Sequence, residues 1–271
     1  MVKIMNEKLV DIIKSVLIKF NEPYIDHKLI KTNGNIVLLL NKKYIVKIAN
    51  RNLLLCEKIF FDYYKGKIYE KLIFNNYEKK YNVYEYINGK PMQNIYDVDG
   101  CLDKIIEHVK TYVKYKKNIY GNILNKNDTW KDFLLYKINQ SCKYLNDYDI
   151  YINDLNKANA ILSTYKFNPR LIHGDLGCYN ILVHNKNIVG IIDPIALVGD
   201  PLYDIIYFIC SHTKIIENIN LNEIIYKINE PKEKIISMMK IISFIRISID
   251  SKHGGKNKKI YKDLWDKLKM Y

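Results

Sequence analysis

Three side chains that could bind a metal ion or move a proton lie close together in the segment RLIHGDLGCYNILVHNKNIVGIIDPIALVGDPLYD, residues 170–204. Asp175 and Asn180 follow one short apolar stretch, and Asp193 ends a second one. A carboxylate and an amide are hard oxygen ligands, which suit Mg²⁺ that still holds phosphate oxygens and waters. The remaining carboxylate, Asp175, could act as a base or orient a reacting hydroxyl.

The stretch between Asn180 and Asp193 predicts a β-hairpin, in which ILVH and IVGIID are joined by a turn at 185–187. With a three-residue turn, pairing back along the strands places Asn180 opposite Ile192. Asp193 would then return beside Asn180. We therefore expect the amide and the carboxylates to converge at one end of the hairpin.

This segment resembles a known family. HGDLGCYN at 173–180 resembles the HxDxxxxN catalytic loop of kinase-like phosphotransferases, and IIDP at 191–194 resembles their metal-binding Asp segment. GDPLYD at 199–204 resembles the continuation in aminoglycoside phosphotransferases. Gly174 replaces the Arg of protein kinases and the Phe-Gly of DFG is absent, which fits small-molecule kinases. Ordinary strand and loop chemistry could explain any one piece, but three pieces in this order favour a kinase-like site.

Lys47 and Glu57 form a second candidate pair. Lys47 lies in the apolar strand YIVKIA at 44–49, where a lysine ordinarily faces water. Glu57 falls within the apolar stripe of a helix predicted at 51–65, and a buried carboxylate needs a partner. We predict that the two side chains pair. The resemblance implies that such a pair positions the nucleotide phosphates.

The resemblance adds three backbone positions for the nucleotide. Gly34, in the break Asn33-Gly34-Asn35 between two predicted strands, matches the sparse phosphate loop of aminoglycoside-type kinases, although it could simply be a turn. NGKP at 88–91 resembles the passage between the two lobes. The backbone from Glu85 to Ile87 would then face the adenine edge; the alternative is an ordinary strand that ends in a turn.

The remaining sequence predicts an α+β chain. Helical spacing of apolar residues indicates a helix at 6–20, and short strands follow up to residue 87. From residue 98 the pattern is helical, with Asp128 and Asp200 as N-caps and a last helix at 259–270. The resemblance implies a bilobal protein-kinase-like fold: a small β-rich N-lobe with one main helix at 1–87, and a larger, mostly helical catalytic and substrate-binding C-lobe at 88–271. It also gives Asp200 a supporting role for the catalytic loop.

Composition bounds the alternatives. The chain has 271 residues and a formal net charge of +14, from 43 Lys and Arg against 29 Asp and Glu. The lysines are scattered without a basic block or an aromatic stripe, so we expect no nucleic acid partner. The five cysteines form no CxxC pair, which supports neither a zinc site nor a disulfide framework. With no signal peptide and no long apolar run, we expect no membrane association and a cytoplasmic location.

Together these features predict a phosphotransferase that uses ATP or GTP with Mg²⁺ to phosphorylate a hydroxyl of a small molecule. Asp175 would be catalytic, Asn180 and Asp193 would hold Mg²⁺, and Lys47 would contact phosphates. The resemblance favours an aminoglycoside antibiotic as acceptor, and hence antibiotic resistance; the alternatives are a choline-type or other metabolite kinase, or a non-catalytic nucleotide-binding regulator. A polycationic acceptor would need carboxylates, for which the candidates are Asp200, Glu217, Glu223, Glu230 and Glu233.

Overall fold

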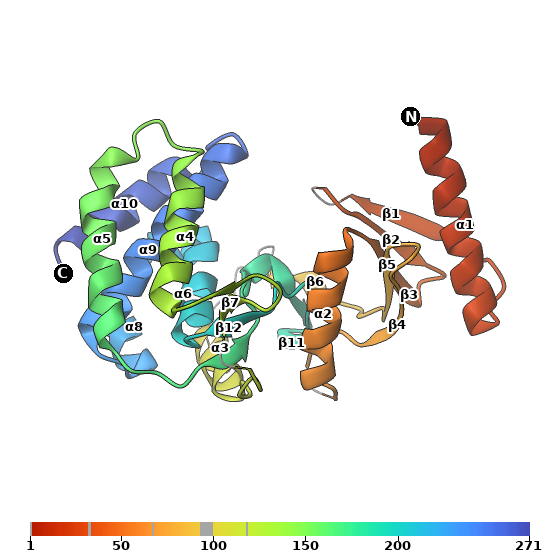
Figure 1. The fold of residues 1–271 in the computed structure, drawn as a ribbon, viewed down its shortest axis with the longest axis horizontal. Helices are drawn as coiled ribbons and strands as arrows, with labels where there is room; N and C mark the ends of the chain where they lie inside the picture. The colour runs from red at the N-terminus through yellow and green to blue at the C-terminus, as the bar shows by residue number, and fades with distance from the viewer. Residues whose placement is uncertain (1, 32–33, 67, 93–99, 118) are drawn as a thin grey trace. The chain divides into compact units, whose positions relative to one another are not determined.

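The structure, a computed structural model, describes residues 2–31, 34–66, 68–92, 100–117 and 119–271. The chain divides into two compact units (Figure 1). Residues 1–89 and 182–192 form the first unit, and residues 90–181 and 193–271 form the second. The division into lobes at 1–87 and 88–271 stays a prediction, and it did not foresee that 182–192 would return to the first unit.

A five-stranded antiparallel sheet, in the order β1-β2-β3-β5-β4, forms the centre of the first unit. Its strands are β1 (His27–Lys31), β2 (Ile36–Leu40), β3 (Tyr44–Ile48), β4 (Leu72–Asn76) and β5 (Tyr81–Glu85). Helices α1 (Val2–Phe20) and α2 (Arg51–Tyr63) flank this sheet (Figure 1).

Alternation along the central strands decides which side chains meet which helix. Val46 and Val83 are fully buried in one cluster with Ile12 and Val16 of α1. Because successive side chains of a strand point to opposite faces, Lys47 lies on the face away from α1. The sequence pattern thus directs Lys47 toward α2.

Strands β10 (Ile181–His184) and β11 (Asn187–Ile191) form a β-hairpin that belongs to the first unit. Only its first residue, Ile181, is assigned to the second unit. Its turn is Asn185-Lys186, and both residues have positive φ, 48° and 64°. This two-residue turn fits the right-handed twist of paired strands. The three-residue turn predicted at 185–187 is therefore wrong, and the pairing derived from it is displaced by one residue.

The second unit is mainly helical. Its helices are α3 (Cys101–Lys110), α4 (Trp130–Cys142), α5 (Asp149–Thr164), α6 (Leu202–Ser211), α7 (Thr213–Glu217), α8 (Leu221–Ile228), α9 (Lys232–Lys252) and α10 (Lys258–Lys269). Helix α9 is central, because it contacts α4, α5, α6 and α10 (Figure 1). Most of its side chains are buried, which explains why its sequence is apolar on nearly every face.

Short strands in the second unit position its loops. A four-stranded sheet has the order β8-β7-β12-β9, with β7 (Tyr120–Asn122), β8 (Lys126–Asn127), β9 (Arg170–Ile172) and β12 (Leu197–Gly199). The remaining short elements are β6 (Lys90–Pro91) and the 3-10 helix η2 (Cys178–Asn180). Because β12 pairs with β9, the segment after Asp193 runs beside the strand that leads into the HGD motif.

The N-cap predicted for α4 was one residue too early. Thr129, rather than Asp128, caps the helix: its hydroxyl accepts the N–H of Asp132 at 3.1 Å, and the Asp132 carboxylate accepts the N–H of Thr129 at 3.1 Å. This reciprocal arrangement is a capping box.

None of the helices in the described part of the chain combines the length and the apolar character that a membrane span requires.

Candidate active site

Lys47 and Glu57 meet in the core of the first unit. The Lys47 ammonium donates a hydrogen bond to the Glu57 carboxylate, which is fully buried. The Tyr84 hydroxyl also donates to that carboxylate, and the Asn82 amide lies 3.4 Å from it. The predicted pairing is therefore present, while its role toward a nucleotide stays a prediction.

The surroundings of this pair supply the carboxylate with further hydrogen-bond donors. Burial raises the pKa of Tyr84 well above its ordinary value, and the negative Glu57 raises it further, so Tyr84 remains a hydrogen-bond donor. Asn82 also donates to the backbone oxygen of Leu54 on α2 at 3.2 Å, which ties β5 to the helix. The Lys47 ammonium is thereby held on a rigid frame of strand and helix.

The three backbone positions predicted for the nucleotide lie in the first unit. Gly34 has a φ of 85° and open space where a side chain would be. The N–H of Glu85 donates to Lys71 O at 3.0 Å, and Ile87 O accepts from the N–H of Gly89 at 2.9 Å. The N–H of Tyr86 also donates, to Lys43 O at 2.8 Å, so only the polar backbone groups between residues 85 and 87 outside these three bonds are candidates for adenine.

The HGD motif forms a tight loop directly after β9. Gly174 has a φ of 80°, and a Cβ atom there would lie 2.5 Å from Leu197 Cγ. Any larger residue would be strained and would clash, which explains why the arginine of protein kinases has no place here. His173 is fully buried, and its backbone oxygen accepts from the N–H groups of Ile195 and Ala196 at 2.9 and 3.2 Å.

Asp204 holds this loop in place. Its fully buried carboxylate accepts the N–H of His173 at 2.7 Å, the N–H of Gly174 at 2.9 Å and the Tyr112 hydroxyl at 2.7 Å. Burial raises the pKa of Asp204 to about 7, although the three donors act in the opposite direction. The loop-supporting role expected of Asp200 thus belongs to Asp204, which the sequence had marked only as the last residue of GDPLYD.

Asp175 and Asn180 lie together at the end of the loop. The Asn180 amide nitrogen donates to the backbone oxygen of Asp175 at 2.8 Å and to its carboxylate at 3.0 Å. Both partners are acceptors, so the nitrogen must face them and the amide oxygen must point the other way. Asn180 could therefore ligate a cation through its oxygen while its nitrogen orients Asp175.

The environment of Asp175 shifts its proton affinity. Burial raises the pKa of this carboxyl above its ordinary value, and the nearby negative Asp193 adds to the rise. The Tyr179 hydroxyl, which donates to Asp175 at 2.7 Å, acts against burial, as does the positive Arg246. The effect of Asp193 on this pKa places the two carboxylates within electrostatic range of each other, while their convergence with Asn180 at one end of the hairpin stays a prediction.

Arg246 of α9 was missed by sequence reasoning. Its guanidinium lies 5.7 Å from the ring centres of Tyr179 and Tyr207 and 5.9 Å from that of Tyr261. Cation–π contacts of this length are favourable. Arg246 follows Asp175 by 71 positions in a nearly continuous apolar helix, so no local pattern could have linked them.

The donor set fits Mg²⁺. Within the described residues, no group of three or more His, Cys, Asp or Glu side chains is placed to hold a metal ion. A Mg²⁺ ion in a kinase site needs only one or two protein oxygens, because phosphates and waters complete its coordination. Asn180 and Asp193 would supply an amide oxygen and a carboxylate, which is the number and kind of ligand that such an ion requires.

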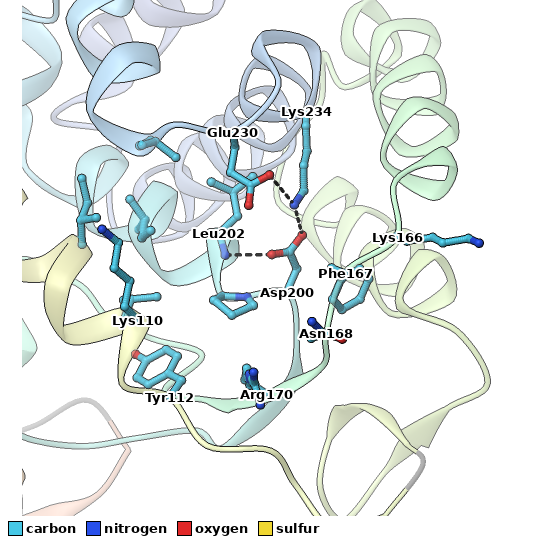
Figure 2. A pocket seen from close by; sticks show the side chains of 15 residues that line it. Lys110, Tyr112, Lys166, Phe167, Asn168, Arg170, Asp200, Leu202, Glu230 and Lys234 are labelled. Carbon is cyan, nitrogen blue, oxygen red and sulfur yellow. Dashed lines mark hydrogen bonds and ion pairs between the residues drawn. The ribbon is translucent and has the colours of Figure 1, made fainter.

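Asp200, also in the second unit, forms an ion pair with a lysine that balances its charge. Lys234 binds the Asp200 carboxylate at 3.0 Å and Glu230 at 3.1 Å, and Asp200 also accepts the N–H of Leu202 at the start of α6 at 3.0 Å (Figure 2). This cluster lines a cavity of about 380 Å³. Three further cations, Lys110, Lys166 and Arg170, stand around the same cavity (Figure 2).

The structure thus engages most of the carboxylates predicted to receive a polycation. Asp200 and Glu230 share Lys234, and Glu223 pairs with Lys227 of its own helix at 3.3 Å. Glu217 and Glu233 are exposed at the end of α7 and the beginning of α9. Three of these five carboxylates are therefore already paired with lysines, and their role toward an acceptor stays a prediction.

Comparison with known proteins agrees with this geometry. Residues 137–223, which contain Asp175, Asn180, Asp193 and Asp204, match the model of a family described as a phosphotransferase enzyme family. No curated protein sequence matches the chain significantly. The evidence that decides the fold comes from solved structures whose similarity extends over almost the whole chain. The fold is protein-kinase-like.

Three solved structures illustrate the similarity. Choline kinase LicA from Streptococcus pneumoniae has a TM-score of 0.69 and 17% identity over 97% of this chain and 99% of its own. A thermostable mutant of aminoglycoside phosphotransferase APH(4)-Ia, in complex with AMP-PNP and hygromycin B, has a TM-score of 0.67 and 13% sequence identity. The match covers 94% of this chain and 96% of that one. The GDP complex of aminoglycoside 2'-phosphotransferase-IIIa has a TM-score of 0.62 and 12% sequence identity. The match covers 96% of this chain and 98% of that one. The resemblance and the fold class predicted from the sequence are confirmed.

Proposed function

We propose that this protein transfers the γ-phosphoryl group of a nucleoside triphosphate to a hydroxyl group of a small molecule. The observation that carries the proposal is the catalytic-loop geometry of the second unit. One loop, anchored by Asp204, holds Asp175 against Asn180 and keeps Asp193 within electrostatic range. The matching phosphotransferase family model and the similar kinase structures support the same reaction.

Each residue has a definite part in this proposal. Asp175 accepts or orients the proton of the acceptor hydroxyl, and its raised pKa brings it closer to neutral pH, which favours a general base. Asn180 and Asp193 hold Mg²⁺, which when bound would neutralise charge on the β- and γ-phosphates. Lys47, fixed by Glu57, contacts the phosphates. Because the transition state of phosphoryl transfer is loose, positioning and charge neutralisation supply most of the catalysis.

The nucleotide can be ATP or GTP, and both belong in the first test. Similar structures contain GDP, AMP-PNP and ADP. Aminoglycosides, which the sequence favours, and choline are the first acceptors to try, because the similar structures include aminoglycoside phosphotransferases and a choline kinase. A cytoplasmic location, a role in antibiotic resistance and the lack of nucleic acid and membrane partners stay predictions.

The test measures nucleotide binding and turnover separately. Calorimetry with ATP and with GTP, with and without Mg²⁺, should show binding that depends on the metal. Release of ADP or GDP should then be followed without acceptor and with kanamycin, hygromycin B or choline. Asp175→Asn should bind nucleotide normally and lose turnover, including slow hydrolysis by water. A protein that binds neither nucleotide in the presence of Mg²⁺ would refute the proposed function.

A further inference from the structure

A second cavity of the helical unit lies beside the proposed catalytic loop. Its volume is about 450 Å³. It is lined by Asn122, Asn125, Asn127, Phe133, Tyr136, Lys137, Gly174, Ile195 and Leu197. Gly174 directly precedes Asp175, and Ile195 follows Asp193 by two positions. A molecule in this cavity would therefore contact the loop directly before Asp175, the residue that is proposed to receive the acceptor proton.

The charge of this cavity is positive. Among the described residues that line the cavity, one is charged: Lys137, on α4. The other polar side chains of the lining are three asparagines and a tyrosine. No described carboxylate lines it. Lys137 is half-buried, forms no ion pair with any described residue and lies within electrostatic range of Asp175. Burial lowers the pKa of Lys137, and the negative Asp175 acts in the opposite direction.

A half-buried ammonium without an ion-pair partner costs free energy. Proteins retain such costly groups chiefly at functional sites, where a ligand supplies the missing charge. An anionic group in the cavity would do so, and the asparagine amides could donate further hydrogen bonds to it. A cationic acceptor would instead meet Lys137 without a lining carboxylate to offset the repulsion.

We propose that the acceptor is an alcohol bearing a carboxylate or phosphate group, which Lys137 binds while the acceptor hydroxyl approaches Asp175. This inference rests on the proposed phosphotransferase function and names the acceptor class for that same site. It departs from the polycationic aminoglycoside that the sequence favours. The reaction is a simple transfer: the acceptor oxygen forms a bond to the γ-phosphorus, the bond to the β-phosphate oxygen breaks, and the hydroxyl proton passes to Asp175.

The experiment uses sets of matched alcohols that differ in one group. One set is glucose, glucuronate, glucose 6-phosphate and glucosamine; the other is glycerol, glycerate, glycerol 3-phosphate and 3-aminopropane-1,2-diol, with kanamycin and choline added. For each alcohol, kcat/KM is obtained from nucleoside diphosphate release after subtracting hydrolysis without acceptor. Wild type is compared with Lys137→Met, with Lys137→Arg, which keeps the charge, and with Lys131→Met, which removes an exposed lysine from the same helix.

We expect the carboxylate or phosphate member of a set to be preferred over its neutral and amine counterparts. A charge-assisted hydrogen bond corresponds to about 10- to 100-fold in kcat/KM, so Lys137→Met should reduce that preference by this factor. The variant should leave acceptor-free hydrolysis and the reaction of the neutral alcohol nearly unchanged. Lys137→Arg should retain most of the preference, and Lys131→Met should behave as wild type.

Several results would overturn the inference while leaving the proposed function intact. One is nucleotide hydrolysis without transfer to any anionic alcohol. Another is a preference for the amine members, for kanamycin or for choline. A third is a preference for anionic alcohols that remains in Lys137→Met. An equal loss of acceptor-free hydrolysis in Lys137→Met would show that this lysine acts on the nucleotide. Absence of both nucleotide binding and hydrolysis in wild type would instead refute the proposed function itself.

Discussion

Replacing Lys47 by Met removes the cation that faces a fully buried carboxylate. Breaking a buried ion pair by removing one partner costs about 3–5 kcal/mol, because the remaining charge is left uncompensated. Glu57 would still accept from the Tyr84 hydroxyl and lie 3.4 Å from the Asn82 amide. We therefore expect a loss at the lower end, about 3 kcal/mol, in the free energy of unfolding of the first unit.

The double variant Lys47→Met with Glu57→Gln removes the stranded charge and keeps an amide oxygen for the Tyr84 hydroxyl. It should recover part of the loss, with a coupling energy of about 1–2 kcal/mol, within the range for residues in contact. Lys43→Met is the matched control. Its ammonium binds Glu22 at 2.8 Å, but its side chain is 54% exposed and the pair is screened by solvent, so its removal should cost much less than the removal of Lys47.

The assay must separate the two units. Both tryptophans, Trp130 and Trp265, lie in the second unit, so their fluorescence during urea unfolding reports on that unit alone. Hydrogen exchange of peptides from β3 and α2 reports on the first unit. The variants should weaken protection of those peptides and leave the tryptophan transition in place. Zero coupling, or a loss in Lys47→Met no greater than in Lys43→Met, would refute the reasoning.

The other predictions concern the second unit. Asp175→Asn should lower turnover by about 10²- to 10⁴-fold while nucleotide affinity from calorimetry stays within error; near-normal turnover would remove Asp175 from the mechanism. Asp193→Ala should abolish the Mg²⁺ dependence of nucleotide affinity, and Asn180→Ala should weaken it less, because an amide is the poorer ligand; unchanged dependence in Asp193→Ala would contradict the assignment. The pKa of Asp204 is raised from 3.8 to about 7, so the folded protein binds this proton more tightly than the unfolded chain. Its contribution should make the free energy of unfolding fall as pH rises from about 4 to about 7, by about 1.4 kcal/mol per unit. Asp204→Asn should flatten that fall in urea titrations; an identical slope in the variant would disprove this origin.

Local patterns in the sequence predicted the parts of the site that depend on neighbours along the chain. Glu57 could be paired with Lys47 because a charge inside an apolar helical stripe conflicts with its surroundings, and the adjacent strand offers one cation. The HGD loop was recognisable from its spacing. The hairpin turn was not, because Asn185-Lys186 lacks the glycine that usually marks a two-residue turn, and lysine seldom adopts a φ of 64°.

Contacts between distant parts of the chain escaped prediction. Tyr112 reaches Asp204 across 92 positions, and Arg246 stands 67 positions from Tyr179. Lys137 carries no signal of its own on α4, where a second lysine, Lys131, is simply exposed. Which lysine faces a cavity depends on how the helix packs, and periodicity alone does not fix that when the apolar stripe is broad.

Among the described residues, Glu57, Asp200 and Asp204 are buried and Asp175 is half-buried; the partners of these four carboxylates are of two kinds, and the difference bears on the metal. Glu57 and Asp200 face lysines, whereas Asp175 and Asp204 are held mainly by hydroxyl and amide donors. Negative charge therefore accumulates at the loop: Asp193 raises the pKa of Asp175, and Asp175 raises that of Asp204. Arg246, behind Tyr179, offsets only part of this repulsion, since burial still dominates the pKa of Asp175. On the proposed assignment, a divalent cation at Asn180 and Asp193 would lower the free-energy cost of an ionised Asp175. Metal binding would then lower the pKa of Asp175. The acid limb of the pH–rate profile should therefore move to lower pH as Mg²⁺ approaches saturation.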